Sequence, residues 1–240
     1  GHAVALMGNH EYNALAYAYE LPDGSHLRKH NGVHNHQHEQ TLLQFGGYED
    51  EWRSYLAWFY SLPLFLELPE LRAVHACWDE EHIEWLRCNG YETMNEELLV
   101  DSHKRGSYPC RVIADVLKGK EFNIPPEYAW HDKDGHLRTE NRYRWWIDAE
   151  TASYGEFLFN CPPHLMKKMI KERIEYVVYP PDAKPVFFGH YWMDDSFPVI
   201  QSGNVVCLDY SIAKGGNLVA YRWSGESILD NRHFVHVHYR

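Results

Sequence analysis

The stretch Ala3-Val4-Ala5-Leu6-Met7-Gly8-Asn9-His10 places five apolar residues directly before a glycine and two polar side chains. Leu71-Arg72-Ala73-Val74-His75 and Pro185-Val186-Phe187-Phe188-Gly189-His190 are two later apolar runs that also end in a histidine, the second one after a glycine. A short apolar run that ends in glycine or a polar residue predicts a buried strand. Because ligands collect at the carboxyl ends of strands in α/β proteins, the three stretches predict one shared site.

The rest of the chain predicts a mixture of helices and strands. We expect helices over 11–19, 36–45, 50–61, 79–88, 94–118 and 163–175. We expect strands over 3–7, 64–68, 71–75, 185–188, 205–208, 218–223 and 233–239, of which 64–68 and 71–75 form a hairpin. This order favours an α/β layered sheet protein over a helix bundle or a pure β-sandwich.

The chain has 240 residues and 45% hydrophobic residues, so one packed domain spanning 1–240 is the expectation. Residues 119–162 are rich in proline, glycine, aromatic and charged residues, which predicts an irregular insertion with a turn at 132–135. The apolar run begins almost at the first residue, without a capping segment or an initiator methionine. We therefore expect this domain to be part of a larger protein.

The formal net charge is -11, with 34 acidic and 23 basic residues. This balance argues against binding to a nucleic-acid duplex, which needs a basic surface. A phosphorylated substrate is not excluded, because a bound metal ion can dominate the local field. No apolar run is long enough to span a membrane, and no signal peptide is visible. The five cysteines form no CxxC pair, which favours reduced thiols in a cytoplasmic protein.

Imidazole, carboxamide and carboxylate groups are suitable ligands for zinc, manganese or iron ions. Asn9, His75 and His190 follow the three expected strands and offer such groups. The chain contains 17 histidines, however, so some of them follow a strand by chance. The residues alone leave a shared site and separate structural histidines as equal alternatives.

Gly8-Asn9-His10-Glu11 matches the GNH[ED] motif of the calcineurin-like metallophosphoesterases. Val74-His75-Ala76 resembles the next histidine motif of that family, and Phe188-Gly189-His190 resembles its later Gly-His motif. Cys207-Leu208-Asp209, followed by Gly215-Gly216-Asn217-Leu218, resembles the closing strand pair of the bacterial phosphoprotein phosphatase and diadenosine tetraphosphatase branch. Order and spacing agree over most of the chain.

The resemblance implies a two-sheet α/β sandwich with flanking helices and a site that holds two divalent metal ions, manganese, iron or zinc. Asn9, His75 and His190 would be ligands of one ion, and Glu11 would hold the loop that carries Asn9. Metal-bound hydroxide would attack phosphorus. His10 would be the general acid, because the pKa of an imidazole lies near neutrality.

The chain departs from the family in two places. The family has an Asp-x-His motif and a GDxxDR motif before GNH[ED], and neither precedes Gly8 here. They would supply the first metal's ligands, the bridging aspartate and an arginine for phosphate, so we expect the first strands and half of the metal site to be missing. His190 is followed by Tyr191 and Trp192, where many relatives have a second histidine. The phosphoprotein phosphatase branch shares this last difference.

Seven further side chains are candidates for substrate binding: His34, His38, Trp78, Arg142, Arg144, Tyr191 and Trp192. The histidines belong to a His-rich stretch, 30–38, that otherwise reads as a polar loop and helix start. The arginines suit phosphate, with packing or a solvated position as the alternative. The aromatic residues follow the later histidine motifs and could stack on a nucleobase or an aromatic leaving group, with core packing as the alternative.

Three functions remain open from the sequence. The first is hydrolysis of a phosphate ester, in which the substrate is a phosphorylated small molecule, a dinucleotide or a phosphoprotein. The second is a non-catalytic metal- or nucleotide-binding domain derived from a phosphoesterase. The third is a structural α/β domain whose histidines follow strands by chance.

Overall fold

A computed structural model describes residues 3–131, 135, 137–171 and 174–238. The chain separates into two compact units. The helical unit comprises Gly1–Leu66 and Glu80–Leu117, and the sheet unit comprises Glu67–Asp79 and Lys118–Arg240. Each unit is therefore built from two separate stretches of sequence, and the prediction of a single domain over 1–240 stays a prediction.

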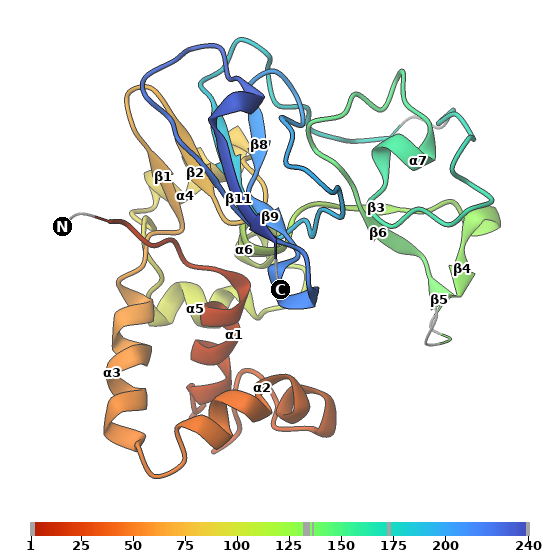
Figure 1. The fold of residues 1–240 in the computed structure, drawn as a ribbon. Coiled ribbons are helices and arrows are strands. Elements are labelled where there is room, and N and C mark those ends of the chain that lie inside the picture. The colour runs from red at the N-terminus through yellow and green to blue at the C-terminus, as the bar shows by residue number, and fades with distance from the viewer. Residues whose placement is uncertain (1–2, 132–134, 136, 172–173, 239–240) are drawn as a thin grey trace. The chain divides into compact units, whose positions relative to one another are not determined.

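Six α-helices belong to the described part of the helical unit (Figure 1). They are α1 (Asn9–Ala18), α2 (Gly32–Gln44), α3 (Glu49–Tyr60), α4 (Glu80–Cys88), α5 (Glu96–Ser102) and α6 (Tyr108–Lys118), whose last residue opens the sheet unit. Asn31 and Asn95 begin α2 and α5, because each side chain accepts a backbone N–H of the first turn. The helix expected over 94–118 is thus two helices.

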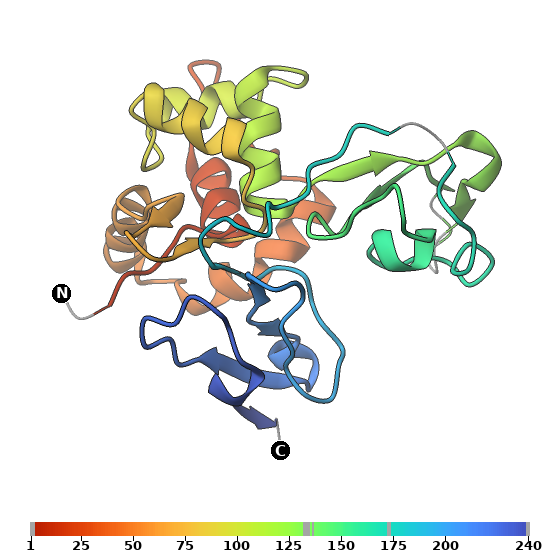
Figure 2. The same ribbon diagram turned by 90° about the horizontal axis from the view of Figure 1, so that it is seen from above.

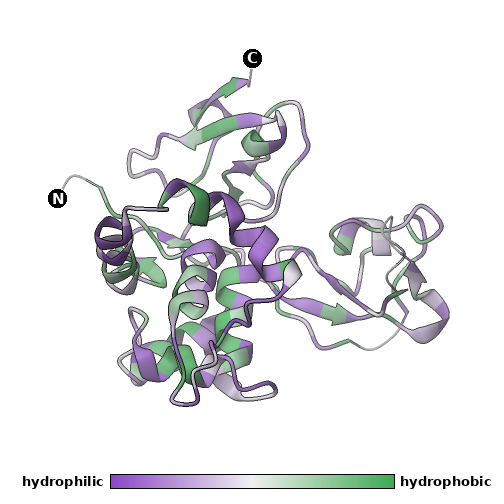
Figure 3. Cartoon of the chain, turned by 90° about the horizontal axis from the view of Figure 1, so that it is seen from below, coloured by the Kyte–Doolittle hydropathy of each residue, from purple (hydrophilic) through white to green (hydrophobic). Residues whose placement is uncertain are grey.

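The core of the helical unit is formed by apolar residues at helical spacing. Apolar and polar residues alternate along the helices in Figure 3, as this spacing requires. In α6 the buried residues are Val112, Ile113, Val116 and Leu117. The helices α2 and α3, in contrast, have no fully buried residue.

The strand expected over 3–7 is wrong, because residues 3–8 have no regular secondary structure. Met7 is buried and its N–H donates to the carbonyl of Pro63 at 2.9 Å. Proline has no N–H to return that bond, so no ladder can form at this point. Residues 3–5 are exposed.

The central sheet has the order β1-β2-β7-β8. Its strands are β1 (Phe65–Glu67), β2 (Arg72–Val74), β7 (Val186–Phe188) and β8 (Val205–Cys207). β2 pairs with β7 and β7 with β8, both in parallel. All residues of β7 and β8 are buried, as expected of parallel strands covered on both faces. The expected strands are confirmed here, and β1 and β2 are neighbours as the hairpin prediction requires.

A second, antiparallel sheet has the order β11-β10-β9 and is seen from above in Figure 2. Its strands are β9 (Asp209–Tyr210), β10 (Asn217–Tyr221) and β11 (Phe234–His238). Phe187 of β7 and Val206 of β8 form a buried cluster against which Tyr221 of β10 and Phe234 of β11 pack. Side chains of the two sheets therefore share one core.

The segment 119–162 is more regular than the sequence predicts. β3 (Glu121–Asn123) pairs with β6 (Glu140–Arg142), and β4 (Trp130–His131) pairs with β5 (Leu137–Arg138). A short helix, α7 (Tyr154–Phe157), follows, and 3₁₀ turns occupy Pro126–Tyr128, Ile212–Lys214 and Asn231–His233. Most of the turn predicted at 132–135 lies outside the described residues.

The helix expected over 163–175 is wrong, because the described residues of this range form turns and loops. Several backbone groups of this segment bond to the segment 152–155 in place of a continuous helical pattern. Tyr154 N–H donates to the carbonyl of Lys168 at 2.8 Å, and Ile170 N–H donates to that of Ala152 at 3.2 Å. A close approach at Gly155 holds the two segments together, since a Cβ there would lie 2.4 Å from the carbonyl oxygen of Met166.

The α/β class is confirmed by this mixture of helices and sheets. All five cysteines are free thiols. Among the described residues, no helix combines the length and the apolar character needed to cross a membrane.

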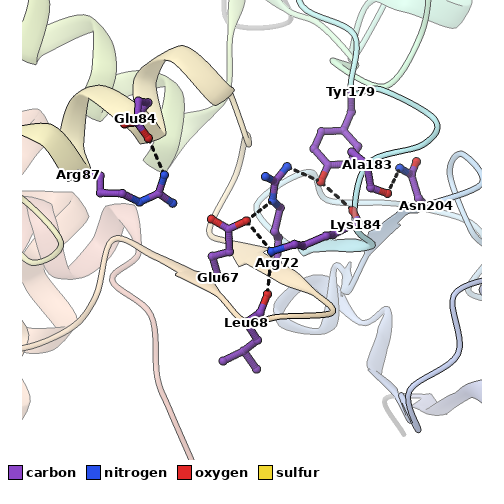
Figure 4. A network of polar contacts seen from close by, with 9 residues as sticks. All are labelled: Glu67, Leu68, Arg72, Glu84, Arg87, Tyr179, Ala183, Lys184 and Asn204. Carbon is purple, nitrogen blue, oxygen red and sulfur yellow. Dashed lines mark hydrogen bonds and ion pairs between the residues drawn. The ribbon is translucent and has the colours of Figure 1, made fainter.

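A polar network joins the end of β1 and the start of β2 to Lys184, which lies two residues before β7 (Figure 4). The Glu67 carboxylate accepts hydrogen bonds from Arg72 Nε and from Lys184 Nζ, each at 3.0 Å. Arg72 also donates to the Tyr179 hydroxyl at 3.1 Å. Burial alone raises the pKa of Glu67, but the bonds from Lys184 and Arg72 outweigh it and hold the pKa below its ordinary value.

At pH 7 we expect Glu67→Gln to lower the free energy of unfolding by about 2 kcal/mol, the scale of hydrogen bonds to a charged group. The folded pKa lies below the ordinary value of 4.5, so this contribution is complete above that pH and is lost as the pH falls through the folded pKa. Denaturant unfolding between pH 7 and pH 3 measures the difference, with exposed Glu127→Gln as control. A difference that increases at low pH would contradict the network.

Candidate functional site

The parallel strands β2, β7 and β8 bring three polar residues to one edge of the central sheet. His75 follows β2 directly, Gly189 and His190 follow β7, and Asp209 stands two residues after the end of β8. Because carboxyl ends of parallel strands lie at the same edge, these side chains emerge together. A Cβ added at Gly189 would lie 3.7 Å from both the His75 carbonyl and the Asp209 Cβ, which shows how closely the three segments approach.

The two histidines face one another within the sheet unit. His75 Nε2 lies 3.3 Å from His190 Nδ1, and their ring centroids are 5.1 Å apart. The Gly189 N–H donates to the His75 carbonyl at 3.0 Å, which fixes the two loops. The sequence prediction that these two residues share one site is consistent with this geometry.

His190 has a left-handed backbone, with φ of 65°. A residue other than glycine or asparagine adopts this backbone conformation at a cost of about 1–2 kcal/mol. The surrounding structure therefore maintains it, and such strain is concentrated at functional sites.

Asp209 is a candidate site residue that the sequence analysis treats only as part of a closing strand pair. Its carboxylate accepts the Ser211 N–H at 3.1 Å, and its carbonyl accepts the Met193 N–H at 3.0 Å. The signal that identifies it is the one used for the histidines: a polar residue that closely follows a buried apolar strand.

Asn9, His10 and Glu11 belong to the helical unit, at the start of α1. The Glu11 carboxylate accepts the Gly8 N–H at 2.9 Å. His10 is exposed and Asn9 is partly exposed. The shared metal of Asn9, His75 and His190 stays a prediction, since these residues belong to different units.

The chemistry of the histidine pair fits a divalent metal ion. Tetrahedral zinc with Zn–N bonds of about 2.0–2.1 Å separates two nitrogen ligands by roughly 3.4 Å, and the imidazole nitrogens stand 3.3 Å apart. Within the described residues, no group of three or more His, Cys, Asp or Glu side chains is arranged to hold a metal ion.

Of the three candidate stacking residues, two are buried. Trp78 is 1% exposed and lies under the Arg72 guanidinium, 4.7 Å from the ring centroid. Tyr191 is 0% exposed and donates to the Tyr143 carbonyl at 2.9 Å. These positions favour the core-packing alternative. Trp192 is 48% exposed, with Lys214 Nζ 3.5 Å from its ring centroid, and it can still stack on a ligand.

The two candidate arginines differ in their surroundings. Arg144 Nη1 donates to the carbonyls of Gly155, Glu156 and Leu158 at 2.8–3.0 Å, so it holds the backbone around α7. Burial lowers the pKa of Arg142, whose guanidinium lies 5.5 Å from the Tyr191 ring centroid. Among the described residues, Arg142 Nε has no hydrogen-bond partner, so Arg142 is the better phosphate candidate of the two.

The two candidate histidines of the His-rich stretch lie on α2 in the helical unit. His34 Nδ1 bonds to the Lys29 carbonyl at 2.8 Å. The His38 ring lies 4.6 Å from that of Tyr17, and burial lowers the pKa of His38, as do the nearby charges of Arg28, His30 and His10. Both positions agree with a helix start and local packing, and a substrate contact stays a prediction.

Comparisons with protein-family models, curated proteins and solved structures found no match.

We expect Arg144→Met to lower the free energy of unfolding by about 3 kcal/mol, because three carbonyl oxygens lose a charged donor. Denaturant unfolding measures this loss, and Arg138→Met, at an exposed position of β5, is the matched control. Unchanged stability together with weaker binding of inorganic phosphate would instead favour the phosphate role for Arg144.

Proposed function

We propose that the chain carries one half of a two-metal phosphoesterase site of the calcineurin-like type and takes part in hydrolysis of phosphate esters. The facing imidazoles of His75 and His190 carry this proposal, because the parallel strands β2 and β7 bring them together from positions 115 residues apart. The strained backbone of His190 is a second, independent support.

In this proposal His75 and His190 supply two nitrogen ligands of one ion and Asn9 supplies an oxygen ligand. Manganese, iron and zinc accept this mixed set. When bound, the ions supply Lewis-acid activation of water and of the phosphoryl oxygens. Glu11 maintains the turn before α1 through its bond to the Gly8 N–H, which positions Asn9.

His10 has the role of general acid in the proposed reaction. It stands beside Asn9 at the start of α1, and its side chain is exposed. An imidazolium can transfer its proton to the leaving oxygen as the bond to phosphorus breaks.

The fold of this proposal is the two-sheet α/β sandwich of that superfamily. The common core of the two sheets, around Phe187 and Val206, supports it. The substrate is a phosphorylated small molecule, a dinucleotide or a phosphoprotein.

We expect His75→Ala and His190→Ala each to weaken binding of manganese or zinc at least tenfold, because each removes one of few ligands. Native mass spectrometry and calorimetry measure the metal content and affinity. His131→Ala, at an exposed position of β4 in the same unit, is the control. Affinities unchanged in both variants would favour the alternative of chance histidines.

In the protein that supplies both halves of the metal site, we expect His10→Gln to lower the rate of phosphate ester hydrolysis without loss of metal, and to do so unequally for different esters. A poor leaving group needs the proton, so the rate with phenyl phosphate should fall about 10²–10⁴-fold. The rate with 4-nitrophenyl phosphate, whose leaving group is stable as an anion, should fall far less. His36→Gln on α2, an 83% exposed side chain, is the control.

Equal losses with both esters would contradict the role of general acid. Metal binding without hydrolysis of either ester, in the protein that supplies both halves of the metal site, would favour the alternative of a non-catalytic metal- or nucleotide-binding domain.

A further inference from the structure

A cavity of about 710 Å³ lies in the sheet unit, among residues outside the histidine pair. Its walls are the segment 193–197, the turn between β9 and β10, and the end of β11. Its volume falls within the range of about 300–1,000 Å³ that is typical of small-molecule sites.

The cavity is connected to the histidine pair through two side chains. The Trp192 ring centroid lies 6.5 Å from that of His190, and Lys214 Nζ lies 3.5 Å from the Trp192 ring centroid. Lys214 also lines the cavity. A ligand could therefore extend from the histidines past this ammonium group into the cavity.

The walls are held in place before any ligand binds. Buried Asn217 accepts a hydrogen bond from His238 at 3.2 Å and donates to the Ser196 carbonyl at 3.3 Å. The Ser211 hydroxyl donates to the Met193 carbonyl at 3.1 Å. A Cβ at Gly216 would lie 2.0 Å from the Tyr210 carbonyl oxygen, so only glycine permits this tight turn. Such preorganisation lowers the cost of binding.

Two features of the lining suit a ligand that combines a ring with a negative charge. Phe197 is 68% exposed, and its ring is nearly perpendicular to that of His236 with centroids 5.7 Å apart, so most of the ring remains accessible to a stacking ligand. Lys214 presents a positive charge at the side of the cavity nearest Trp192.

The lining also contains two carboxylates, Asp194 and Asp195. Burial lowers the pKa of Arg144, and the negative charges of these two carboxylates act in the opposite direction. Their negative charge is therefore partly balanced from outside the cavity. The Lys214 ammonium remains directed to the Trp192 face.

We propose that this cavity binds the planar ring of a phosphate ester whose phosphate lies between Lys214 and His190. The ring stacks on Phe197, and the ligand is a nucleotide or an aryl phosphate. The position of the phosphate rests on the proposed phosphoesterase function, whereas the ring site rests on the cavity alone.

Calorimetry on the whole chain with adenosine monophosphate, phenyl phosphate, ribose 5-phosphate and adenosine tests this proposal. We expect adenosine monophosphate and phenyl phosphate, which carry an aromatic ring, to bind at least tenfold more tightly than ribose 5-phosphate. Phe197→Ala should weaken the binding of adenosine monophosphate about tenfold, which is within the range for loss of one stacking partner. The affinity for ribose 5-phosphate should be unchanged. Lys214→Met should weaken the binding of both phosphates that carry an aromatic ring and leave the affinity for adenosine unchanged.

Matched controls exist for both variants. Tyr48→Ala removes an aromatic side chain of the helical unit that is 61% exposed. Lys168→Met removes a lysine that makes the same kind of contact as Lys214, with Nζ 3.6 Å from the Tyr128 ring centroid, and that does not line the cavity. Thermal unfolding of each variant verifies that it is folded.

Equal affinity for phosphates with and without an aromatic ring, or equal effects of Phe197→Ala and Tyr48→Ala, would overturn the proposal. Manganese titration separates it from the proposed function. If the wild-type chain binds no metal, and Phe197→Ala still weakens the binding of adenosine monophosphate, the ring site is supported and the proposed phosphoesterase function is contradicted. A preference for adenosine monophosphate or for phenyl phosphate identifies the ring class and supports the proposal either way.

Discussion

The parallel pairing of β2, β7 and β8 is the constraint on which the candidate site depends. The pairs Ala73–Phe187 and Phe188–Cys207 align the strand ends, so the loops that follow begin at the same edge. β7 is bonded on both sides and wholly buried, so it cannot shift by one residue without turning its apolar side chains over. The facing imidazoles of His75 and His190 are a consequence of this register, because the two residues closely follow the paired strands β2 and β7.

The elements that the sequence predicts correctly are those whose pattern is local. The helix over 50–61 has its aromatic residues at helical spacing, and the strands at 185–188 and 205–208 are short apolar runs. The two failures depend on a partner elsewhere in the chain. Residues 3–7 have the composition of a strand, yet the neighbouring backbone offers Pro63. Residues 163–171 have helix-forming residues, yet their backbone is bonded to the segment 152–155. The secondary structure of these two segments is decided by pairing with distant residues, and the local composition carries no information about that pairing.

The residues of the candidate site are predictable from the sequence to about the same extent as the helices and strands. A polar residue after an apolar strand identifies His75 and His190, and the same rule reaches Asp209. It does not separate Tyr191 from Trp192: the two are consecutive, and one is wholly buried while the other is 48% exposed. The cavity is harder still to predict, because its lining comes from three separate segments and its shape depends on a glycine turn at Gly216. No local pattern marks residues that meet only when β9, β10 and β11 have formed.

The left-handed backbone at His190 links the histidine pair to the cavity. At φ of 65° the chain turns sharply, so that Tyr191 enters the core, Trp192 faces outward to Lys214 and Met193 bonds back to Asp209. Glycine would make the same turn with less strain, as it does at eight described positions of this chain. His190 therefore adopts a strained backbone conformation that glycine would adopt more easily. What histidine adds at this position is an imidazole placed beside that of His75. The buried Tyr191 hydroxyl and the Met193–Asp209 bond supply the surroundings that hold the strained turn, and the same two contacts place the first wall of the cavity.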